Sequence, residues 1–333
     1  MLDALKARST VDVFDRAPRG AKRASDVLNH LRESCRFLVT SLTHPQDNLY
    51  LALSGGFGQF YDSLYVLVCK LQRRRMFIHH HSFAYVNEPT RLSRLFFSLV
   101  RHQTHIVLSR NMGAALIEVY GLDPDKVKVL SNAAFFSAPG RAVPLNHRGA
   151  MPIRLGFISN ITIEKGFVEF FGVLSELTRL GVPYRAVIAG PVDPSVQRQF
   201  SELLARTDNT TAAGPLYGDA KDRFFQQLDI LLFPTKYANE AEPLVIHEAL
   251  RHGVPVIACD RGAIAEILQN GAGSAFPANG FTDGAVARIR AFVADPDALA
   301  RAQRASLEES QRISRQADST LADLLTEIAG RPT

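Results

Sequence analysis

Residues 237–265, YANEAEPLVIHEALRHGVPVIACDRGAIA, decide how the rest of the chain is interpreted. The stretch opens as a polar loop that carries two carboxylates, Glu240 and Glu242. A helix is predicted from about Pro243, because first-turn N–H groups have no helical partner and proline lacks only such a group. Gly253 ends this helix ahead of a short buried strand over residues 254–259. Its apolar stripe consists of Leu244, Val245, Ala249 and Leu250.

The amino-terminal end of this helix suits an anion, because its first N–H groups are unpaired and its dipole is positive there. Glu248 lies about one and a half turns inside the helix, on a face that Glu240 can approach from the loop. Two carboxylates on either side of an anion site fit a ligand that carries both phosphates and hydroxyls.

The spacing Glu240-x7-Glu248, followed by Ala-Leu-x-x-Gly-x-Pro-Val-Ile and preceded by Leu-Phe-Pro-Thr, resembles the donor-site signature of family 4 glycosyltransferases. These are retaining enzymes with the two-domain GT-B fold. The resemblance implies that Glu240 holds hydroxyls of the donor sugar and Glu248 the ribose of the nucleotide. It also implies that backbone amides between them take the diphosphate, within the donor-binding stretch Glu242, Pro243, Leu244 and Val245. Pro243 stands where many members have glycine, which removes one amide.

Length and composition agree with a two-domain globular protein. The chain has 333 residues, of which 46% are hydrophobic. Its three cysteines, Cys35, Cys69 and Cys259, lie in apolar settings without metal-type spacing, which favours buried thiols in a reducing compartment. We find no signal peptide and no run of apolar residues long enough to cross a membrane, so a cytoplasmic location is expected.

Charge is distributed unevenly along the chain. Residues 1–150 have a net charge of +9 and residues 151–333 a net charge of −4. A basic first half fits an anionic partner such as a membrane surface or an acidic glycan, and no motif points to nucleic acid. We expect salt-sensitive, peripheral attachment to the inner face of the cytoplasmic membrane through Arg73, Arg74, Arg75, Arg91, Arg94 and Arg101.

In the first half, strand–helix units are predicted from residue 49 onward. Gly55 and Gly56 follow a strand over 49–53, either as a plain turn or as part of an acceptor-binding loop. The strand over 76–78 leads into three histidines, of which His79 and His81 share a face. A metal would need a third ligand, which is absent, and hydrogen-bonded structural histidines remain an alternative. The family resemblance implies that His81, or else His79, meets the donor sugar.

The second half alternates strands and helices more regularly, which predicts a doubly wound parallel sheet with its ligands at the carboxyl ends of the strands. Lys165 matches the lysine of the family's diphosphate clamp, and Asn160 stands where many members have arginine. Gly190 ends the strand over 184–189. Tyr217 lies near the end of a predicted strand and is expected to flank the nucleotide base.

The resulting fold prediction is α/β, with two Rossmann-like domains facing a cleft. The first domain is expected at 1–148, the nucleotide-sugar domain at 149–310, and a final helix at 311–333 returning to the first domain. A short strand over 10–14 would be the second strand of the first domain, as though the first strand–loop–helix unit were absent.

The predicted function is retaining sugar transfer from a nucleotide sugar to a hydroxyl of a glycan or lipid-linked glycan, without a metal or other cofactor. Glu240, His81 and Lys165 are the predicted catalytic residues. Two alternatives stay open: an epimerase of the same architecture, and a non-catalytic protein that binds nucleotide sugars or glycans.

Overall fold

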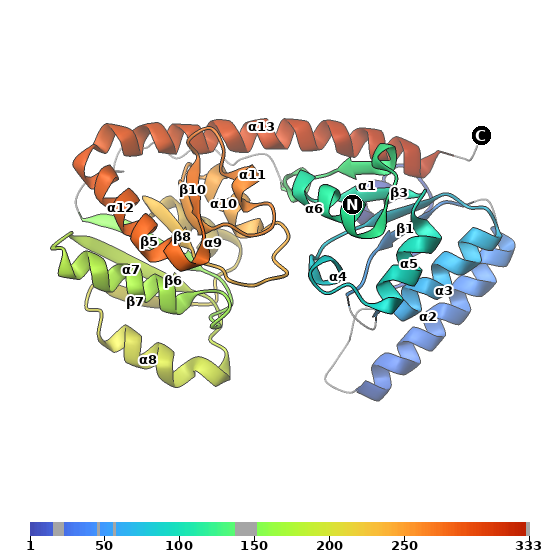
Figure 1. The fold of residues 1–333 in the computed structure, drawn as a ribbon, viewed down its shortest axis with the longest axis horizontal. Helices are drawn as coiled ribbons and strands as arrows, with labels where there is room; N and C mark the ends of the chain where they lie inside the picture. Colours follow the sequence, from blue (N-terminus) through green and yellow to red (C-terminus); the bar gives the residue numbers. More distant parts are fainter. Residues whose placement is uncertain (16–22, 45–46, 56–57, 137–151, 331–333) are drawn as a thin grey trace. The chain divides into compact units, whose positions relative to one another are not determined.

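The computed structural model describes residues 1–15, 23–44, 47–55, 58–136 and 152–330, and it divides the chain into two compact units (Figure 1). Unit 1 comprises residues 1–135 and 317–333, and unit 2 comprises residues 136–316. The division falls thirteen residues before the predicted boundary at 148, and the chain returns to unit 1 at Ala317 instead of residue 311. Each unit is described by itself.

Unit 1 is built on a parallel sheet whose strands follow chain order, β1-β2-β3-β4. The strands are β1 (Leu49–Ala52), β2 (Met76–His79), β3 (Thr104–Val107) and β4 (Val127–Val129). Since the chain crosses the sheet in one direction only, right-handed crossovers place the connecting helices on one face. The helices of this unit are α1 (Leu2–Lys6), α2 (Arg23–Thr43), α3 (Gly58–Leu71), α4 (Ala84–Asn87), α5 (Arg91–Val100) and α6 (Arg110–Tyr120).

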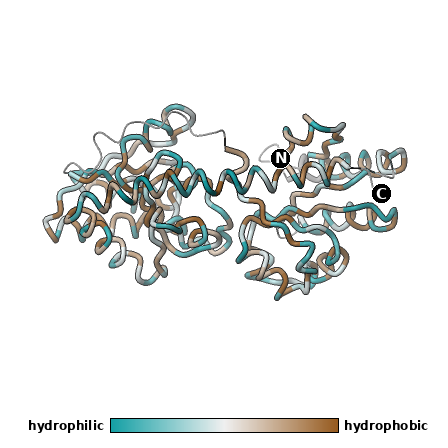
Figure 2. Tube along the Cα trace, turned by 90° about the horizontal axis from the view of Figure 1, so that it is seen from above, coloured by the Kyte–Doolittle hydropathy of each residue, from teal (hydrophilic) through white to brown (hydrophobic). Residues whose placement is uncertain are grey.

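The opposite face of this sheet is covered by α1 and by the end of the last helix, α13 (Pro296–Ala329). Phe77 of β2 and Ile106 of β3 pack there against Leu5, Leu324 and Ile328. Hydrophilic and hydrophobic residues alternate along α13 (Figure 2), as expected of a helix that buries one side. The two ends of the chain therefore contribute to one core.

Local signals explain most boundaries in unit 1. Ser109 caps α6 by accepting a hydrogen bond from Met112 N, and Gly121 ends it in the left-handed conformation, with φ 63°. Thr90 caps α5 in the same way through Ser93 N.

Two predictions for unit 1 are wrong. The first is the strand over 10–14, because those residues form neither strand nor helix. The prediction that all three cysteines are buried fails for Cys35, which is exposed.

Unit 2 is built on a six-stranded parallel sheet in the order β10-β9-β8-β5-β6-β7. From β5 the chain moves outward through β6 and β7, then returns to β8 beside β5 and moves outward the other way. The switch point therefore lies between β5 and β8. The strands are β5 (Ile153–Ile158), β6 (Tyr184–Ala189), β7 (Thr210–Gly214), β8 (Ile230–Phe233), β9 (Val256–Cys259) and β10 (Gly273–Phe276).

The core of unit 2 lies between the sheet and two helices, α7 and α12, with Phe157, Phe170 and Phe281 at its centre. The unit's helices are α7 (Phe167–Arg179), α8 (Gln197–Ala205), α9 (Gly218–Gln226), α10 (Leu244–Arg251), α11 (Ile264–Ile267) and α12 (Phe281–Ala294). The sequence did not predict β10, because Gly-Ser-Ala-Phe carries little β-forming signal and is only half-buried. No described helix is long and apolar enough to cross a membrane.

Candidate active site

The switch point of unit 2 brings together two residues predicted to be catalytic. Lys165 lies in the loop after β5, and Glu240 lies in the loop after β8. Lys165 Nζ is 2.6 Å from Glu240 Oε2, and the two side chains are 23% and 11% exposed. The ammonium also lies 4.8 Å from the ring centre of Tyr237. In doubly wound sheets ligands bind at this position, where adjacent loops diverge from the strand ends.

Backbone contacts hold the two loops against each other. Gly166 has φ 84°, and a Cβ there would lie 2.0 Å from the carbonyl oxygen of Pro234, so only glycine fits. Lys236 N donates to Glu164 O at 2.7 Å. Thr235 Oγ1 donates to Glu240 Oε2 at 3.1 Å, which fixes the carboxylate from a second side. Lys165 and Glu240 therefore lie on two loops that are hydrogen-bonded to each other.

Two other residues predicted to bind the donor lie on the neighbouring strand ends. Asn160, exposed, comes two residues after β5. Gly190 comes directly after β6 with φ 131°, and a Cβ there would lie 1.8 Å from Ser159 O. This close approach accounts for the glycine without a ligand, so the donor-binding role of Gly190 stays a prediction.

Helix α10 begins as predicted, with Pro243 as its N-cap and no side-chain cap. Leu244 is exposed and Val245 half-buried, so the helix start faces solvent in part. Glu242 instead points into the protein: it is buried, and its Oε1 lies 2.9 Å from His247 Nε2. The side chain of Glu242 therefore fixes the start of α10, and any contact with phosphate would come from its backbone.

Glu248 lies on α10 and pairs with a lysine that the sequence did not single out. Lys221 Nζ of α9 is 2.6 Å from Glu248 Oε2 and 2.8 Å from Oε1. One signal in the sequence could have identified Lys221. It lies in the first half of a helix, where a cation is disfavoured by the dipole, so its presence there suggests a partner such as a carboxylate.

Tyr217 is the N-cap of α9 and 77% exposed, so the strand before it ends earlier than expected, at Gly214.

The histidines at the end of β2 alternate as predicted. The rings of His79 and His81 are 4.1 Å apart, and His80 turns to the other side, where its Nε2 lies 3.0 Å from His105 Nδ1. His79 is fully buried and its Nδ1 lies 2.5 Å from Tyr50 Oη, whereas His81 is exposed. Any contact with a ligand therefore falls to His81, with His79 beneath it.

Burial keeps three of these histidines, His79, His80 and His105, neutral. It lowers the pKa of His79 to about 3 and that of His105 to about 4, and the pKa of His80 is also well below its usual value.

On the acceptor side, Gly55 is exposed, and no atom lies within 4 Å of the position that a Cβ would take, so a lack of space does not explain the glycine there. Gly56, the other glycine predicted there, lies outside the described residues.

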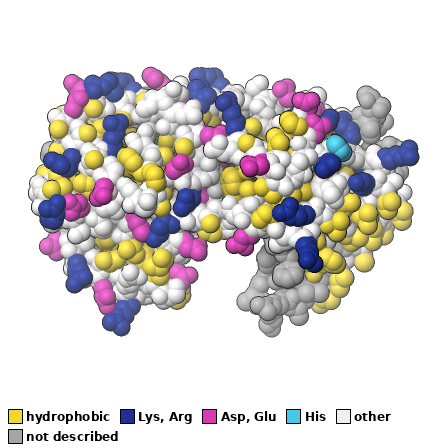
Figure 3. Space-filling view, viewed as in Figure 1, with side chains coloured by type: hydrophobic (Ala, Val, Ile, Leu, Met, Phe, Trp, Pro, Cys, Tyr) yellow, Lys and Arg dark blue, Asp and Glu magenta, His cyan; other side chains and the backbone are white. Residues whose placement is uncertain are grey.

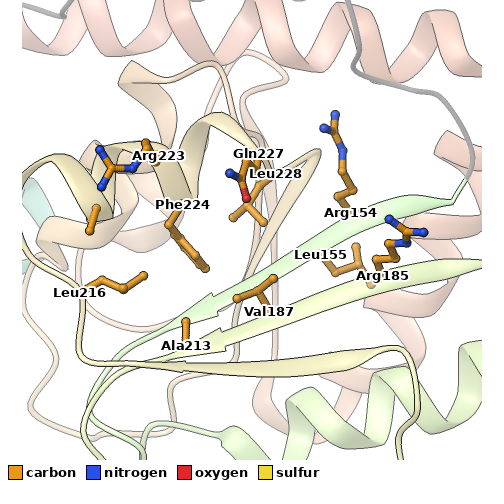
Figure 4. A pocket seen from close by; sticks show the side chains of 11 residues that line it. Arg154, Leu155, Arg185, Val187, Ala213, Leu216, Arg223, Phe224, Gln227 and Leu228 are labelled. Atoms are coloured by element: carbon orange, nitrogen blue, oxygen red, sulfur yellow. The ribbon is translucent and has the colours of Figure 1, made fainter.

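A cavity of about 480 Å³ lies elsewhere in unit 2, between α9 and the strands β5, β6 and β7 (Figure 4). Its lining is mostly apolar and includes Val187, Leu216 and Phe224 together with Arg185 and Arg223. None of the residues predicted to bind the donor lines this cavity, so it is not the candidate site.

Within the described part of the chain, no group of three His, Cys, Asp or Glu side chains is placed to hold a metal ion.

Comparisons with solved structures identify the fold. HepE (Alr3699) from Anabaena, solved with UDP, has a TM-score of 0.71 at 17% identity, covering 90% of this chain and 84% of that one. A glycosyltransferase from Rickettsia africae has a TM-score of 0.70 at 16% identity, covering 94% and 84%. Sucrose-phosphate synthase from Thermosynechococcus elongatus has 0.69 at 15% identity, covering 93% and 80%. Together with the two parallel sheets, these matches define the GT-B fold.

The family follows from the sequence of unit 2. Residues 147–312 match the model of the family described as glycosyl transferases group 1, and this part of the chain belongs to that family. The matched region contains both loops of the switch point and helix α10. No curated protein matches the chain.

Proposed function

We propose that this protein is a retaining glycosyltransferase, which moves a sugar from a nucleotide-sugar donor to a hydroxyl of a glycan or lipid-linked glycan. The observation that carries the proposal is the Lys165–Glu240 pair at the switch point, inside the region that matches the family. HepE is similar in fold and was solved with UDP. A sugar transferase needs an anion site and a hydroxyl site side by side, and this pair supplies one group for each.

In the proposed reaction the bond between the anomeric carbon and the diphosphate oxygen breaks, and the acceptor oxygen bonds to that carbon on the same face. Negative charge grows on the diphosphate, where the ammonium of Lys165 stabilises it. The acceptor proton passes to the departing phosphate oxygen, so no strong protein base is needed.

The ion pair explains how donor binding could organise the site. In the structure Lys165 and Glu240 neutralise each other. When the diphosphate draws the ammonium toward itself, the Glu240 carboxylate loses part of its ion pair and needs new hydrogen-bond donors, because a buried carboxylate without its partner is costly. Hydroxyls of the donor sugar provide them. The phosphate contact and the sugar contact are thus coupled through one salt bridge.

The remaining roles are assigned by position. Glu248, held by Lys221, is proposed to accept from the ribose hydroxyls, and the exposed His81 to meet the reacting sugar ring. Asn160 is proposed to give the diphosphate a neutral hydrogen bond where relatives use a charged one. The protein is proposed to act in the cytoplasm and to need no metal.

The test is a turnover assay with a panel of nucleotide sugars, with and without glycan acceptors, in excess EDTA. We expect a glycoside that keeps the anomeric configuration of the donor, as NMR would show, and a rate that EDTA does not change. Conversion of the donor to its epimer without acceptor would support the epimerase instead. Donor binding without turnover across all acceptors would support a non-catalytic binding protein.

A further inference from the structure

Helices α2 and α3 of unit 1 expose an unusual amount of apolar surface. Nine large hydrophobic side chains on them are between 37% and 78% exposed. On α2 they are Leu28, Leu31, Leu38, Val39 and Leu42, and on α3 they are Phe60, Leu64, Leu67 and Leu71. Figure 3 shows hydrophobic side chains gathered over these helices. Contiguous apolar surface of this kind marks an interaction site more often than chance exposure.

The nine residues form two stripes that face away from the core. On α3 the buried residues include Tyr65, Val66 and Cys69, and the exposed stripe at 60, 64, 67 and 71 lies on the opposite side of the helix. On α2 the inner side is defined by contacts with α3. His30 stacks on Tyr61 with ring centres 4.5 Å apart, and Phe37 meets Tyr65 at 4.3 Å.

The side of α2 that these contacts leave free carries the second stripe. Residues 28, 31, 35, 38, 39 and 42 recur at helical spacing, and position 35 is the exposed Cys35. Helix α3 is therefore apolar on both its inner and its outer side, which is unfavourable for a helix that faces only water. We call this two-stripe surface the α2–α3 face.

Charge around the α2–α3 face is positive. Arg32, Arg36 and Lys70 are exposed on the two helices, and Arg73 follows α3. Among the described side chains of α2 and α3 both carboxylates, Glu33 and Asp62, are buried. Arg32 and Arg36 share Glu33, at 3.0 and 2.9 Å, so the face keeps a net positive charge.

We propose that the α2–α3 face docks onto an anionic lipid surface, with its leucines in the interface and its cations at the headgroups. Helices bind anionic membranes in this way when an apolar stripe is bordered by lysine and arginine, because the apolar side chains are buried and the cations are attracted to the headgroups. A second copy of the chain is the less favourable occupant, because two positively charged faces would repel each other. The proposal rests on the proposed function, for which it places a lipid-linked acceptor within reach of unit 1.

This surface differs from the arginine-only attachment expected from the sequence. Arg74 is buried, and its guanidinium donates to the Asp47 carbonyl and to Ser41 Oγ, so it cannot meet a membrane. The attachment should therefore keep an apolar component that salt does not remove.

The test uses the full chain labelled at Cys35 with an environment-sensitive fluorophore, since the other two thiols are buried. Vesicles of phosphatidylglycerol and phosphatidylcholine should shift its emission to shorter wavelength and float with the protein, whereas vesicles of phosphatidylcholine alone should bind it more weakly. An unlabelled sample in the flotation assay checks that the label itself does not cause binding.

Matched variants locate the surface. Leu64→Glu and Leu180→Glu change side chains of similar exposure, 37% and 36%, in unit 1 and unit 2 respectively. Leu64→Glu and the more exposed Leu71→Glu should weaken vesicle binding roughly tenfold or more each, and Leu180→Glu should not. Circular dichroism checks that each variant is folded.

Nucleoside diphosphate binding, measured by calorimetry on the same samples, separates this proposal from the enzymatic one. All the variants should bind the nucleotide like the wild type. Nucleotide binding without vesicle binding would overturn the docking proposal alone. A dimer in sedimentation velocity that Leu71→Glu dissociates, with no flotation, would assign the face to a second copy instead.

Discussion

The two sheets of this protein differ in how their strands are ordered, and this difference separates their chemistry. In unit 2 the order reverses between β5 and β8, and the loops on either side of the reversal carry Lys165 and Glu240. In unit 1 the strands follow chain order, and the described part of its sheet has no such reversal. Its β2 ends instead in histidines, of which His79 and His80 are buried and have lowered pKa values.

The comparison teaches where an anionic ligand can be held. At the switch point two loops diverge, so charged side chains from both can converge on one ligand. The buried histidines at the end of β2 are neutral, so they offer hydrogen bonds without the charge that strengthens contacts with a diphosphate. We therefore expect loss of charge in unit 2 to have much larger effects on turnover than changes in unit 1.

The largest effect is expected for Lys165→Ala. Without the Lys165 ammonium, the negative charge that grows on the leaving diphosphate loses its stabilisation, so kcat should fall by roughly 10²- to 10³-fold. Lys128→Ala is the matched control, because Lys128 also pairs with a carboxylate, Glu327, and is similarly half-buried, but lies in unit 1. Steady-state kinetics would measure both. Equal losses would mean that the comparison between the two sheets is mistaken.

A smaller effect is expected for Glu240→Gln, which keeps the shape of the side chain and removes its charge. Turnover should fall by about ten- to a hundredfold, because hydrogen bonds to a charged acceptor contribute about 1.5–3 kcal/mol. Nucleoside diphosphate should still bind, since Lys165 remains. If Glu240→Gln abolished binding of the diphosphate as well, the assignment of Glu240 to the sugar would be wrong.

Glu248→Gln sharpens the same contrast within unit 2. Its ribose role predicts weaker binding of both donor and nucleoside diphosphate, again by about 1.5–3 kcal/mol. The midpoint of thermal unfolding without ligand, measured alongside, shows whether the loss reflects stability instead, because Lys221 would lose its partner. Unchanged nucleotide affinity would contradict the ribose role.

The histidines of unit 1 predict a pH dependence of stability. The pKa values of His79 and His105 are lowered to about 3 and about 4, so the unfolded chain binds protons near pH 6.5 and the folded chain does not. The contribution of each histidine to the free energy of unfolding is therefore fully present above pH 6.5. It is lost as the pH falls below 6.5, by about 1.4 kcal/mol per pH unit for each histidine.

Urea unfolding at pH 7 and pH 5, followed by circular dichroism, would measure this loss. His105→Gln should reduce the difference between the two pH values by about 2 kcal/mol, since one titrating group is gone. An unchanged difference would mean that His105 is not neutral in the folded protein.

The fold and the loops of the switch point could be predicted from the sequence, because both depend on local signals. The strand over 184–189 is found at the predicted residues, and α10 begins beside Pro243 as proline geometry requires. The strand over 10–14 failed because alternating residues alone cannot show whether a partner strand exists. The partners of Glu248 and Glu242 were not predicted either, since Lys221 is far from Glu248 in sequence and His247 looked like an ordinary helix residue.

The exposed face of α2 and α3 was also beyond the sequence. From the sequence alone Tyr61, Leu64 and Leu67 would be assigned to the core, because an apolar helix usually is buried. Only the packing of α2 against one side of α3 shows that the stripe with Leu64 and Leu67 stays open. Of the arginines expected at a membrane, Arg73 and Arg75 are exposed, whereas Arg74 is buried and hydrogen-bonded within the protein; the attachment itself stays a prediction.

The central claim is that the switch point of unit 2 binds the diphosphate of the donor, and calorimetry tests it most directly. Wild type, Lys165→Ala and Lys128→Ala would be titrated with nucleoside diphosphates of different bases. We predict that at least one of them binds the wild type, that Lys165→Ala weakens its affinity by roughly tenfold or more, and that Lys128→Ala leaves it unchanged. Equal affinity in wild type and Lys165→Ala, or no binding of any nucleoside diphosphate, would contradict the claim.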